Sequence, residues 1–367
     1  MNILITGSSG FIAKNLIIRL KENSFKIIEF NRSHNNNLLK DKIAKSDIIV
    51  HLAGENRSTN EELFINNNIK LTEEICNIIK FNNFRIPLLF SSSIHSSLPN
   101  KYGRSKQKAE NLLIDLYKET NNPINIFKLP GVFGKWSKPF YNSVVSTFCH
   151  SVANNLEIQI NDPNKIIKLI YIDDLVNEFI FTIKNFKSGL KFGDIKPCYE
   201  ISIKELANKI KNLKNLRENL YTDKVGKGLI KKLYSTYLTY LPFEESFYEI
   251  PVHKDSRGNF IEILKTTDSG QFSYFSAKPG ITRGGHYHHT KSEKFLLIKG
   301  KAKFRFSNIL TKEYKEIFLS EEKPIIVDTI PGWSHDITNI GENEMIVLLW
   351  ANEIFDEDNP DTFIHKI

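Results

Sequence analysis

The first twenty residues constrain the fold more than any other stretch of the chain. An apolar run at residues 2–6 has the length of a buried strand, and the turn GSSG separates it from an amphipathic helix pattern. A strand, a glycine turn and a helix start are the required setting of a dinucleotide-binding loop in a parallel sheet. We expect Gly7 to make the tight turn and Gly10 to let a pyrophosphate approach the helix N-terminus, where Phe11 and Ile12 follow.

The residues after the next two apolar runs bear on the choice of cofactor. A second strand is predicted at Lys26–Phe30, and the nearby Arg32 suits the 2′-phosphate of NADP(H). Glu29 is also close and would suit the ribose 2′-hydroxyl of NAD, so the preference for NADP(H) rests on Arg32. A third run ends in HLAG, where Leu52 and Ala53 are expected to let the adenosine half of the cofactor lie against the backbone.

A serine run followed by a helix carries the candidate catalytic groups. A short apolar strand at residues 88–90 is expected to break into three serines, and a helical pattern begins at Tyr102. On a helix, Tyr102 and Lys106 share one face, so the ammonium is expected to lower the pKa of the phenol. Ser93 could hold a carbonyl oxygen against that phenol, with Ser92 as its rival. Together these groups make a general acid for ketone reduction, although an amphipathic helix can carry Tyr and Lys by chance.

Composition argues against several classes of protein. The formal net charge of +8 is spread along the chain without a block of like charge, which disfavours nucleic-acid binding. The sequence has no apolar run of about 18 residues and no signal-peptide pattern at its N-terminus, so we expect no membrane span and no export. The cysteines Cys76, Cys149 and Cys198 are far apart, which fits buried thiols in a reducing compartment and a cytoplasmic protein.

Five motifs of the first half, in this order and spacing, resemble the extended short-chain dehydrogenases/reductases of the sugar-nucleotide branch. The motifs are TGSSGFIA, HLAG, Asn68, SSS and YGRSK. The resemblance implies a doubly wound, Rossmann-type parallel sheet over residues 1–242, a nicotinamide cofactor and a UDP-sugar substrate. It implies Ser93, Tyr102 and Lys106 as the catalytic set, with the last two also touching the cofactor. Asn68 matches the asparagine of the family's central helix and is expected on the cofactor side.

The same resemblance extends to a region that would meet the substrate. LPGVFG at residues 129–134 resembles the family's loop beside the nicotinamide, and YIDDLV at residues 171–176 resembles a later family element. The segment at residues 135–148 stands where such enzymes bind nucleotide sugars. Candidate contacts in it are Lys138, Tyr141 and Asn142. A surface lid is an equal alternative for this segment.

The pattern of apolar and polar residues in the sequence changes after Pro242. An aromatic, amphipathic segment at residues 227–241 is expected to pack the two halves of the chain together. Short alternating strands with glycine and proline turns then predict an all-β barrel or sandwich over residues 243–367. The predicted strands are Phe260–Leu264, Phe272–Ala277, Lys294–Ile298, Ala302–Phe306, Ile325–Thr329 and Met345–Trp350.

Four side chains of the second half have the spacing of a metal site. His286 and His288 would face the same side of a strand, and Glu293 would enter from the next strand. With His335 they make three imidazoles and one carboxylate, which suit a divalent transition metal, with zinc as the expected ion. The spacing resembles the two-part pattern of the cupins and implies a cupin barrel. A vestigial cupin that keeps its histidines but holds no metal is the alternative.

Two smaller motifs resemble the dTDP-4-keto-6-deoxyhexose 3,5-epimerases. DSRGNFIE at residues 255–262 resembles their DxRGxFxE element, and TRGGH at residues 282–286 resembles their RGxH, whose histidine abstracts a proton. We therefore expect Arg257 and Arg283 to contact the substrate, and His286 acquires a second possible role as a base. If His286 binds the metal, another group must be the base. Candidates for that group are Lys294, His289 and Tyr274, of which strand alternation disfavours Lys294.

The order of the two halves resembles the bifunctional epimerase/reductases of capsular polysaccharide synthesis. The resemblance implies that the cupin epimerises C3 of a UDP-2-acetamido-2,6-dideoxy-4-hexulose and that the first domain reduces C4 with NADPH. The product would be UDP-N-acetyl-6-deoxy-L-talose, on the route to N-acetyl-L-fucosamine. A homodimer is implied by the resemblance alone. The rival interpretations are a reductase whose cupin only dimerises or binds sugar, and a sugar-nucleotide binder without activity.

Overall fold

The computed structural model divides into two compact units, which are described separately. The first holds Met1–Phe133, Phe140–Ser143 and Ile166–Ile201, and the second holds Gly134–Pro139, Val144–Lys165 and Ser202–Ile367. The units are defined by contacts between residues, and each combines segments that are not consecutive in the chain. The expected domain boundary at residue 242 therefore stays a prediction. The structure describes residues 1–31, 37–57, 60–218, 221–222, 224–250, 253–255, 258–260, 265–266, 270–353 and 358–367.

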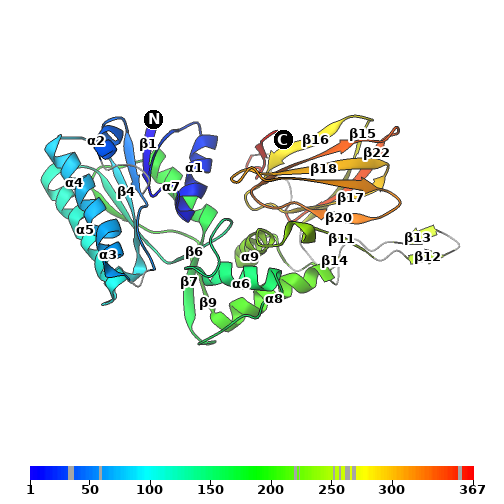
Figure 1. Cartoon of the computed structure of the whole chain (residues 1–367), viewed down its shortest axis with the longest axis horizontal. Helices are drawn as coiled ribbons and strands as arrows, with labels where there is room; N and C mark the ends of the chain where they lie inside the picture. The colour runs from blue at the N-terminus through cyan, green and yellow to red at the C-terminus, as the bar shows by residue number, and fades with distance from the viewer. Residues whose placement is uncertain are drawn as a thin grey trace. The chain divides into compact units, whose positions relative to one another are not determined.

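A six-stranded parallel sheet organises the first unit (Figure 1). In spatial order its strands are β2 (Lys26–Phe30), β1 (Asn2–Thr6), β3 (Ile48–His51), β4 (Leu88–Ser93), β5 (Ile124–Leu129) and β8 (Leu190–Gly193). The chain moves from β1 outward to β2 and then returns to the other side of β1 as β3. Ligands of such sheets bind outside the carboxyl ends of the strands at this switch point. The predicted doubly wound parallel sheet is confirmed.

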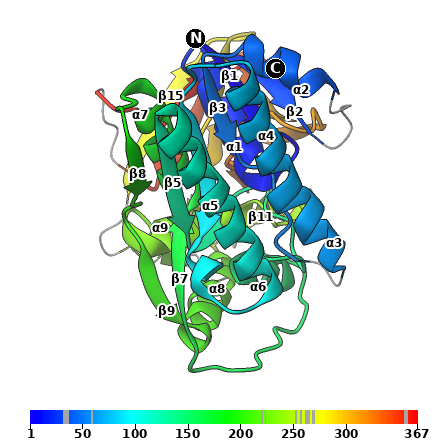
Figure 2. The ribbon, with the colours of Figure 1, turned by 90° about the vertical axis from the view of Figure 1, so that its left-hand side faces the viewer.

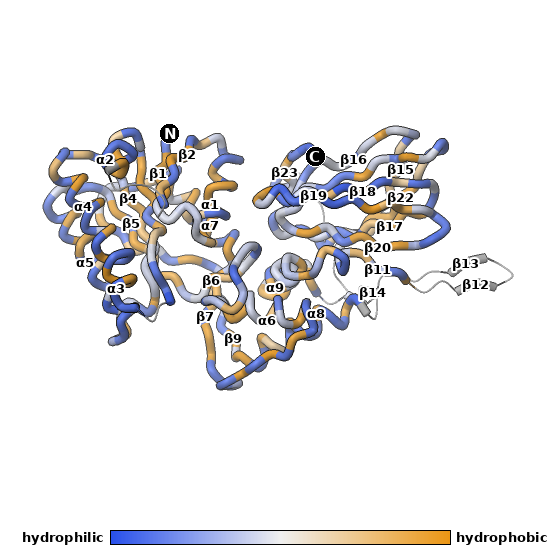
Figure 3. The backbone as a smooth tube through the Cα atoms, in the orientation of Figure 1, coloured by the Kyte–Doolittle hydropathy of each residue, from blue (hydrophilic) through white to orange (hydrophobic). Residues whose placement is uncertain are grey.

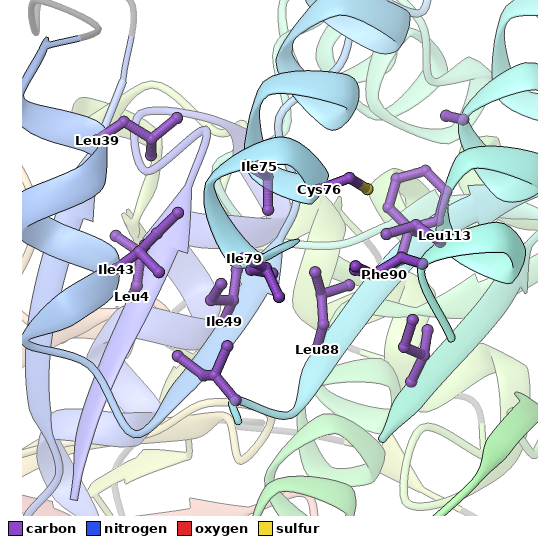
Figure 4. Packing of buried hydrophobic residues seen from close by; sticks show 14 of the residues in the cluster. Leu4, Leu39, Ile43, Ile49, Ile75, Cys76, Ile79, Leu88, Phe90 and Leu113 are labelled. Carbon is purple, nitrogen blue, oxygen red and sulfur yellow. The ribbon is translucent and has the colours of Figure 1, made fainter. Parts of the chain in front are cut away.

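Helices cover both faces of this sheet (Figure 1). On one face, α2 (Asn37–Ala44), α4 (Leu71–Phe81) and α5 (Lys101–Thr120) bury apolar side chains against the strands, as Figure 4 shows for Leu4, Ile79 and their neighbours. Helices α4 and α5 run side by side in Figure 2 and contact each other. Helices α1 (Phe11–Glu22) and α7 (Ile172–Lys184) pack together on the opposite face.

The region from β4 to α5 differs in detail from the expectation. Strand β4 does not break at the serines but continues through Ser93, and all six of its residues are buried. Helix α5 begins after Asn100, whose side chain accepts a hydrogen bond from the amide of Gly103 (2.7 Å). The short helical elements of this unit are α3 (Glu61–Phe64), the π-helix η1 (Ile65–Lys70) and the 3₁₀-helix η2 (Ile94–Ser97).

Smaller elements connect the two halves of the chain. A three-stranded sheet consists of β6 (Gly131–Phe133), β7 (Ile166–Tyr171) and β9 (Tyr199–Ser202). In the second unit, α6 (Val144–Ala153), α8 (Ile203–Glu218) and α9 (Gly228–Leu238) pack on one another. Helix α9 accounts for most of the aromatic segment that the sequence analysis singled out. Among the helices of the described residues, none combines the length and the apolar character that crossing a membrane requires.

Two five-stranded sheets form most of the second unit, and every pair of neighbouring strands in them is antiparallel. One has the order β11 (Phe247–Glu249), β20 (Ile325–Asp328), β17 (Glu293–Lys299), β22 (Met345–Ala351) and β15 (Gln271–Ala277). The other has the order β19 (Tyr314–Ser320), β18 (Lys301–Asn308), β21 (Trp333–Asn339), β16 (Thr282–Tyr287) and β23 (Phe363–Ile364). The hydropathy colours of Figure 3 show apolar residues along these strands, and side chains such as Phe295, Phe304 and Met345 form a buried cluster contributed by both sheets.

The described strands form two antiparallel sheets with the core between them, which agrees with the all-β barrel or sandwich expected from the sequence, and the cupin barrel itself stays a prediction. Strands β19 and β21 are absent from the predicted set, since charged residues and a histidine interrupt their apolar pattern. The strand expected to carry both His286 and His288 is β16, which ends at Tyr287, so His288 lies just past it. Most of the predicted strand Phe260–Leu264 lies outside the described residues. The remaining short elements are η3 (Phe243–Glu245), β10 (Tyr221–Thr222), β12 (His253–Asp255), β13 (Gly258–Phe260) and β14 (Lys265–Thr266).

Candidate active site and metal centre

The glycine turn after β1 packs tightly against the backbone that follows β3. Gly7 has a φ of 68°, and a Cβ atom there would lie 2.7 Å from the Cα of Ala53 and 3.1 Å from the carbonyl carbon of Leu52. Only glycine fits this position. The amide of Gly10 donates to the carbonyl of Gly7 (2.8 Å), and Gly10 precedes the first turn of α1. The backbone amides of that turn lie at the switch point of the sheet, where they can hold a pyrophosphate.

A buried histidine at the end of β3 ties three elements to this turn. Thr72 donates its hydroxyl to the carbonyl of Asn68 (2.7 Å), so its oxygen accepts from Nε2 of His51 (2.9 Å). Nδ1 of His51 then accepts the hydroxyl of Thr6 (2.7 Å). The oxygen of Thr6 also receives the amide of Ala53 (3.3 Å). The ring of His51 therefore fixes β1, β3 and α4 around the backbone that faces the glycine turn.

We expect His51→Gln to reduce the dependence of stability on pH in mildly acidic solution. Burial, and then the charge of Lys106, lower the pKa of His51 from 6.5 to about 3. The unfolded chain therefore binds this proton more tightly, so stability is complete above about pH 6.5 and is lost as the pH falls toward 3. Between pH 7 and 5 the wild-type loss through His51 is about 2 kcal/mol.

Urea unfolding at several pH values measures this difference. The His51→Gln protein should show a shallower decline in its free energy of unfolding than the wild type. His95→Gln makes the same change at an exposed position and should keep the wild-type slope. Equal slopes for His51→Gln and the wild type would contradict a neutral, buried His51.

Asn68 connects the loop after β3 to helix α5. Its Oδ1 accepts the amide of Glu55 (2.6 Å), and its Nδ2 donates to the carbonyl of Glu55 (2.9 Å) and the hydroxyl of Ser105 (2.8 Å). Ser105 in turn donates to the carbonyl of Tyr102 (2.7 Å). These contacts use both amide hydrogens of Asn68 and position the Glu55 backbone, and the expected place of Asn68 on the cofactor side stays a prediction.

The structure separates the two rival serines. Ser92 donates its hydroxyl to the buried carboxylate of Glu110, which also pairs with Lys128 (3.2 Å). The hydroxyl of Ser93 is hydrogen-bonded to the phenol of Tyr102. The fold therefore brings Ser93 to Tyr102 and directs Ser92 to another partner.

The predicted lowering of the Tyr102 pKa is wrong for this structure. Burial raises the pKa of Tyr102, and the hydrogen bond with Ser93 lowers it by less. The ammonium of Lys106 donates to the carbonyl of Ser91 (3.0 Å), and burial lowers the pKa of Lys106 to about 8 against the opposing charge of Glu110. A phenol that keeps its proton at neutral pH is the form that a general acid needs.

The expected substrate contacts lie in different parts of the structure. Tyr141 donates its hydroxyl to the buried carboxylate of Glu55 (2.7 Å), and Arg57 donates to the carbonyl of Tyr141. These bonds fasten the loop that contains Tyr141 and the exposed Asn142 to the residues after β3. Lys138 is exposed and belongs to the second unit, so its expected role next to Tyr141 stays a prediction.

A cluster of four potential metal ligands lies in the second unit. His286 is on β16, His288 directly follows that strand, Glu293 begins β17, and His335 is on β21 opposite His286. Potential ligand atoms of these four residues all lie within 4.8 Å of one another. The three imidazole centroids are 4.9 to 5.1 Å apart. The structure thus brings together the complete set predicted from the sequence.

The protonation states of this cluster suit a cation. Burial, followed by the neighbouring imidazoles, lowers the pKa of His286 to about 3, and burial lowers the pKa of His335 as well. Burial alone would raise the pKa of Glu293, but the hydrogen bonds and charges of His288 and His335 hold it well below its ordinary value. The shifts of His286, His335 and Glu293 favour the neutral imidazole and the ionised carboxylate, which are the forms of these groups that bind a divalent metal.

The hydrogen bonds of His288 provide a second indication that the residues fit a metal ion. Its Nδ1 lies 2.5 Å from the carbonyl oxygen of Asp361, which can only accept, so Nδ1 carries the proton. The other ring nitrogen, Nε2, lies 3.0 Å from Oε2 of Glu293. The same oxygen lies 3.4 Å from Nε2 of His335. A carboxylate oxygen that faces two imidazole nitrogens at these distances shares either a proton or a metal ion with them.

The three candidates for the C3 base have different surroundings. Lys294 forms a buried ion pair with Asp328 (2.6 Å), which agrees with its predicted direction away from the metal ligands. His289 is buried, and its ring packs edge-on against Phe363 with centroids 4.9 Å apart. Tyr274 is 75% exposed on β15. Of the three, His289 shares the segment that joins the metal ligands, and its role as a base stays a prediction.

Of the three arginines predicted to contact the cofactor or the substrate, the structure describes Arg283. Arg283 is exposed, and its guanidinium lies over the ring of Phe275 at 5.0 Å from the centroid. Arg257 and Arg32 lie outside the described residues, so the predicted sugar contact and the preference for NADP(H) remain predictions.

Sequence reasoning missed three acidic residues that support the two sites. Glu55 directly follows the HLAG motif, and Glu110 lies four residues after Lys106 on α5, so their spacing was an available signal. Asp361 bonds to the segment around His288 from 73 residues away. No local pattern connects such distant positions.

Comparison with known proteins defines the class. Residues 3–196 match the NAD dependent epimerase/dehydratase family, and residues 253–363 match the polysaccharide biosynthesis C-terminal domain. This chain belongs to the NAD dependent epimerase/dehydratase family. Membership of that family implies a nicotinamide cofactor, which agrees with the glycine turn at the switch point of the sheet.

Individual relatives are similar to this chain over nearly its whole length. UDP-2-acetamido-2,6-beta-L-arabino-hexul-4-ose reductase of Pseudomonas aeruginosa is 48% identical over 364 residues, which cover 99% of this chain and 98% of that protein. The crystal structure of the capsular polysaccharide assembling protein CapF from Staphylococcus aureus is 37% identical and covers 100% of both chains with a TM-score of 0.67. UDP-glucuronic acid 4-epimerase from Bacillus cereus, at 16% identity, covers 59% of this chain and 84% of its own with a TM-score of 0.52, which is a likeness of fold alone.

Proposed function

We propose that this chain is a bifunctional nucleotide-sugar enzyme of capsular polysaccharide synthesis. In this proposal the second unit's metal centre epimerises C3 of a UDP-2-acetamido-2,6-dideoxy-4-hexulose. The parallel-sheet domain then reduces the C4 ketone with NADPH to UDP-N-acetyl-6-deoxy-L-talose. The observation that carries the proposal is the coexistence of two chemically complete sites in a chain that matches a hexulose reductase from end to end.

The reductase step uses groups that the first unit holds in place. The nicotinamide supplies the hydride that reaches C4 of the sugar. Tyr102 gives its phenolic proton to the C4 oxygen as that oxygen gains negative charge. Ser93, hydrogen-bonded to the phenol, orients the carbonyl oxygen. The charge of Lys106, fixed by the Ser91 carbonyl, stabilises the phenolate that remains.

The epimerase step uses the acidity that the C4 ketone gives to the C3 proton. A divalent metal would supply Lewis-acid stabilisation of the enolate oxygen. His286, His288, Glu293 and His335 would hold that ion. Loss of the C3 proton and its return to the opposite face of the sugar invert the centre without any change of oxidation state. The epimerised ketone is then the substrate for reduction.

One alternative has a definite observation in its favour. Strand β15, at one edge of its antiparallel sheet, carries exposed aromatic residues, with Phe272 at 46% and Tyr274 at 75% exposed. A face of this kind suits contact with a second copy of the chain. The β-sheets would then serve a reductase as a dimerising or sugar-binding module without catalysis.

Exchange of the C3 proton tests the proposal directly. The protein is incubated in D₂O with the UDP-linked 4-keto sugar and without nicotinamide cofactor, and deuterium at C3 is followed by NMR. We expect exchange with the metal-loaded wild type. Removal of the metal by a chelator, or His288→Ala, should abolish it. His95→Ala, which lies outside the ligand cluster, should exchange like the wild type.

Two outcomes would redirect the assignment. If C3 does not exchange while the same protein consumes NADPH with this substrate, the non-catalytic alternative is correct. If neither C3 exchange nor NADPH consumption occurs, the chain binds nucleotide sugars of this class without transforming them, or it acts on a different sugar. Further 4-keto sugars distinguish the last two cases.

A further inference from the structure

The last ten residues of the chain form a strap across the strands that carry the metal ligands. Strand β23 pairs antiparallel with β16, with Ile364 opposite His286 and Phe363 opposite Tyr287. Beyond it, the amide of His365 donates to the carbonyl of Gly285 (2.8 Å). The carbonyl of His365 accepts the hydroxyl of Ser334, the neighbour of His335 on β21. The strap therefore joins the two strands from which the three histidines come.

The backbone of Asp361 in this strap acts on one metal ligand directly. Its carbonyl oxygen accepts the Nδ1 proton of His288 (2.5 Å). This bond fixes the orientation of the ring and the tautomer in which Nε2 keeps its lone pair. Nε2 is the ring nitrogen that faces Glu293. An outer partner of this kind sets both the direction and the basicity of a metal-bound imidazole.

The carboxylate of Asp361 acts on the segment that joins His288 to Glu293. One oxygen accepts the amide of His289 (2.8 Å). The other accepts the amides of Thr290 (2.5 Å) and Lys291 (2.7 Å) and the hydroxyl of Thr290 (2.8 Å). The donors thus come from three consecutive residues, which fixes the path of the backbone between two ligands.

Lys291 makes a further contact between the strap and the ligand cluster. Lys291 donates through Nζ to the hydroxyl of Thr362 (3.0 Å), and its ammonium lies 3.5 Å from Oε1 of Glu293. Lys291 is 9% exposed, so this charge is largely shielded from water. The strap therefore also holds the cation that pairs with the one carboxylate of the cluster.

We propose that Asp361 is a positioning residue of the metal centre, through its carbonyl on His288 and its carboxylate on the segment 289–291. The inference rests on the metal site of the proposed function and adds to it a residue from the chain terminus. Loss of such an outer partner weakens metal binding by about tenfold to a hundredfold in known sites. Removal of the Asp361 carboxylate leaves the carbonyl bond to His288 in place, so we expect a loss at the lower end of this range, about tenfold.

Metal affinity, measured by competition with a chromophoric chelator, tests this role. The variant is Asp361→Asn, in which one acceptor oxygen is replaced by an NH₂ group that cannot accept from the backbone amides facing it. The metals are Zn²⁺ for affinity and Co²⁺ for its visible spectrum, which reports the ligand geometry. Glu342→Gln, the same change at an exposed carboxyl of the second unit, is the control and should bind like the wild type. Equal affinity and equal spectra for Asp361→Asn and the wild type would overturn the inference.

Thermal unfolding separates positioning from a general effect on folding. A purely structural role would lower the unfolding temperature of the metal-free protein and leave the rise on adding metal unchanged. Positioning requires that the rise itself becomes smaller. If Asp361→Asn does not fold, Thr290→Val removes one donor to the carboxylate and should weaken metal binding by a smaller factor; unchanged affinity there would also contradict the inference. A wild type that binds no metal would defeat the proposed function, whereas a wild type and variant that bind equally defeat only this inference.

Discussion

Tyr102→Phe is expected to abolish ketone reduction and to leave C3 exchange intact. The substitution removes only the hydroxyl whose proton would go to the C4 oxygen. That hydroxyl is bonded to Ser93 and is kept protonated because burial raises its pKa. Loss of a general acid of this kind lowers the rate by about 10²- to 10⁴-fold. The rate of NADPH oxidation with the 4-keto sugar measures the loss, and NMR of the same sample measures C3 exchange.

Matched variants on the same elements make this result specific. Tyr117→Phe removes a hydroxyl further along α5 and should leave reduction unchanged. Ser93→Ala should slow reduction, whereas Ser92→Ala should not, because the hydroxyl of Ser92 is directed at Glu110. Normal reduction by Tyr102→Phe would exclude the phenol as the acid. Loss of C3 exchange together with reduction would contradict the division of labour between the two sites.

Local chemistry explains why much of both sites could be predicted from the sequence. Gly7 must be glycine because the Ala53 backbone lies where a Cβ atom would be, and such a requirement appears in the sequence as a fixed turn. Tyr102 and Lys106 are neighbours on α5 through helical spacing alone. His286 lies on β16, His288 directly follows it and Glu293 begins the next strand, so the three are close in sequence and their convergence also follows from a short-range pattern.

Features that depend on distant parts of the chain could not be predicted in this way. The side-chain hydrogen bonds from Thr6 to His51 and from His51 to Thr72 join three elements that are far apart in the sequence. Asp361 reaches the His288 segment only because β23 returns to pair with β16. The choice between Ser92 and Ser93 depends on how β4 faces α5, and helical or strand period does not specify it.

The correction to the pKa of Tyr102 has its physical cause in the fold. The pKa of Tyr102 rises because burial outweighs local interactions, and burial is a property of the whole fold. Sequence patterns thus predicted which groups meet more reliably than the environment in which they meet.

Asp328→Asn is expected to destabilise the protein by about 3–5 kcal/mol, because it leaves two buried cations without their common anion. Oδ1 of Asp328 lies 2.6 Å from Nζ of Lys294, and Oδ2 lies 2.9 Å from Nη1 of Arg217. The side chains of Asp328 and Lys294 are 3% and 5% exposed. Burial alone would lower the pKa of Lys294, but the charge of Asp328 outweighs it and raises that pKa above its ordinary value. Denaturant unfolding at neutral pH, compared with the wild type, measures the loss.

An exposed ion pair in the same sheet provides the control. Glu249 on β11 pairs with Lys323 at 2.6 Å, but their side chains are 65% and 66% exposed. Glu249→Gln should therefore change the free energy of unfolding by less than about 1 kcal/mol. A loss of this small size for Asp328→Asn would show that the buried charges are solvated in some other way.

The double variant Asp328→Asn with Lys294→Met identifies the origin of the cost. If the loss comes from cations that have no partner, removal of Lys294 should restore part of the stability, even though one more hydrogen bond is lost. Arg217 would remain, with its guanidinium stacked on Tyr248 at 4.7 Å from the ring centroid, a contact that tolerates a single charge. If the double variant is instead less stable than Asp328→Asn alone, the packing of the Lys294 side chain contributes more than its charge. The sign of this coupling thus decides whether electrostatics or packing holds β17, β20 and α8 together.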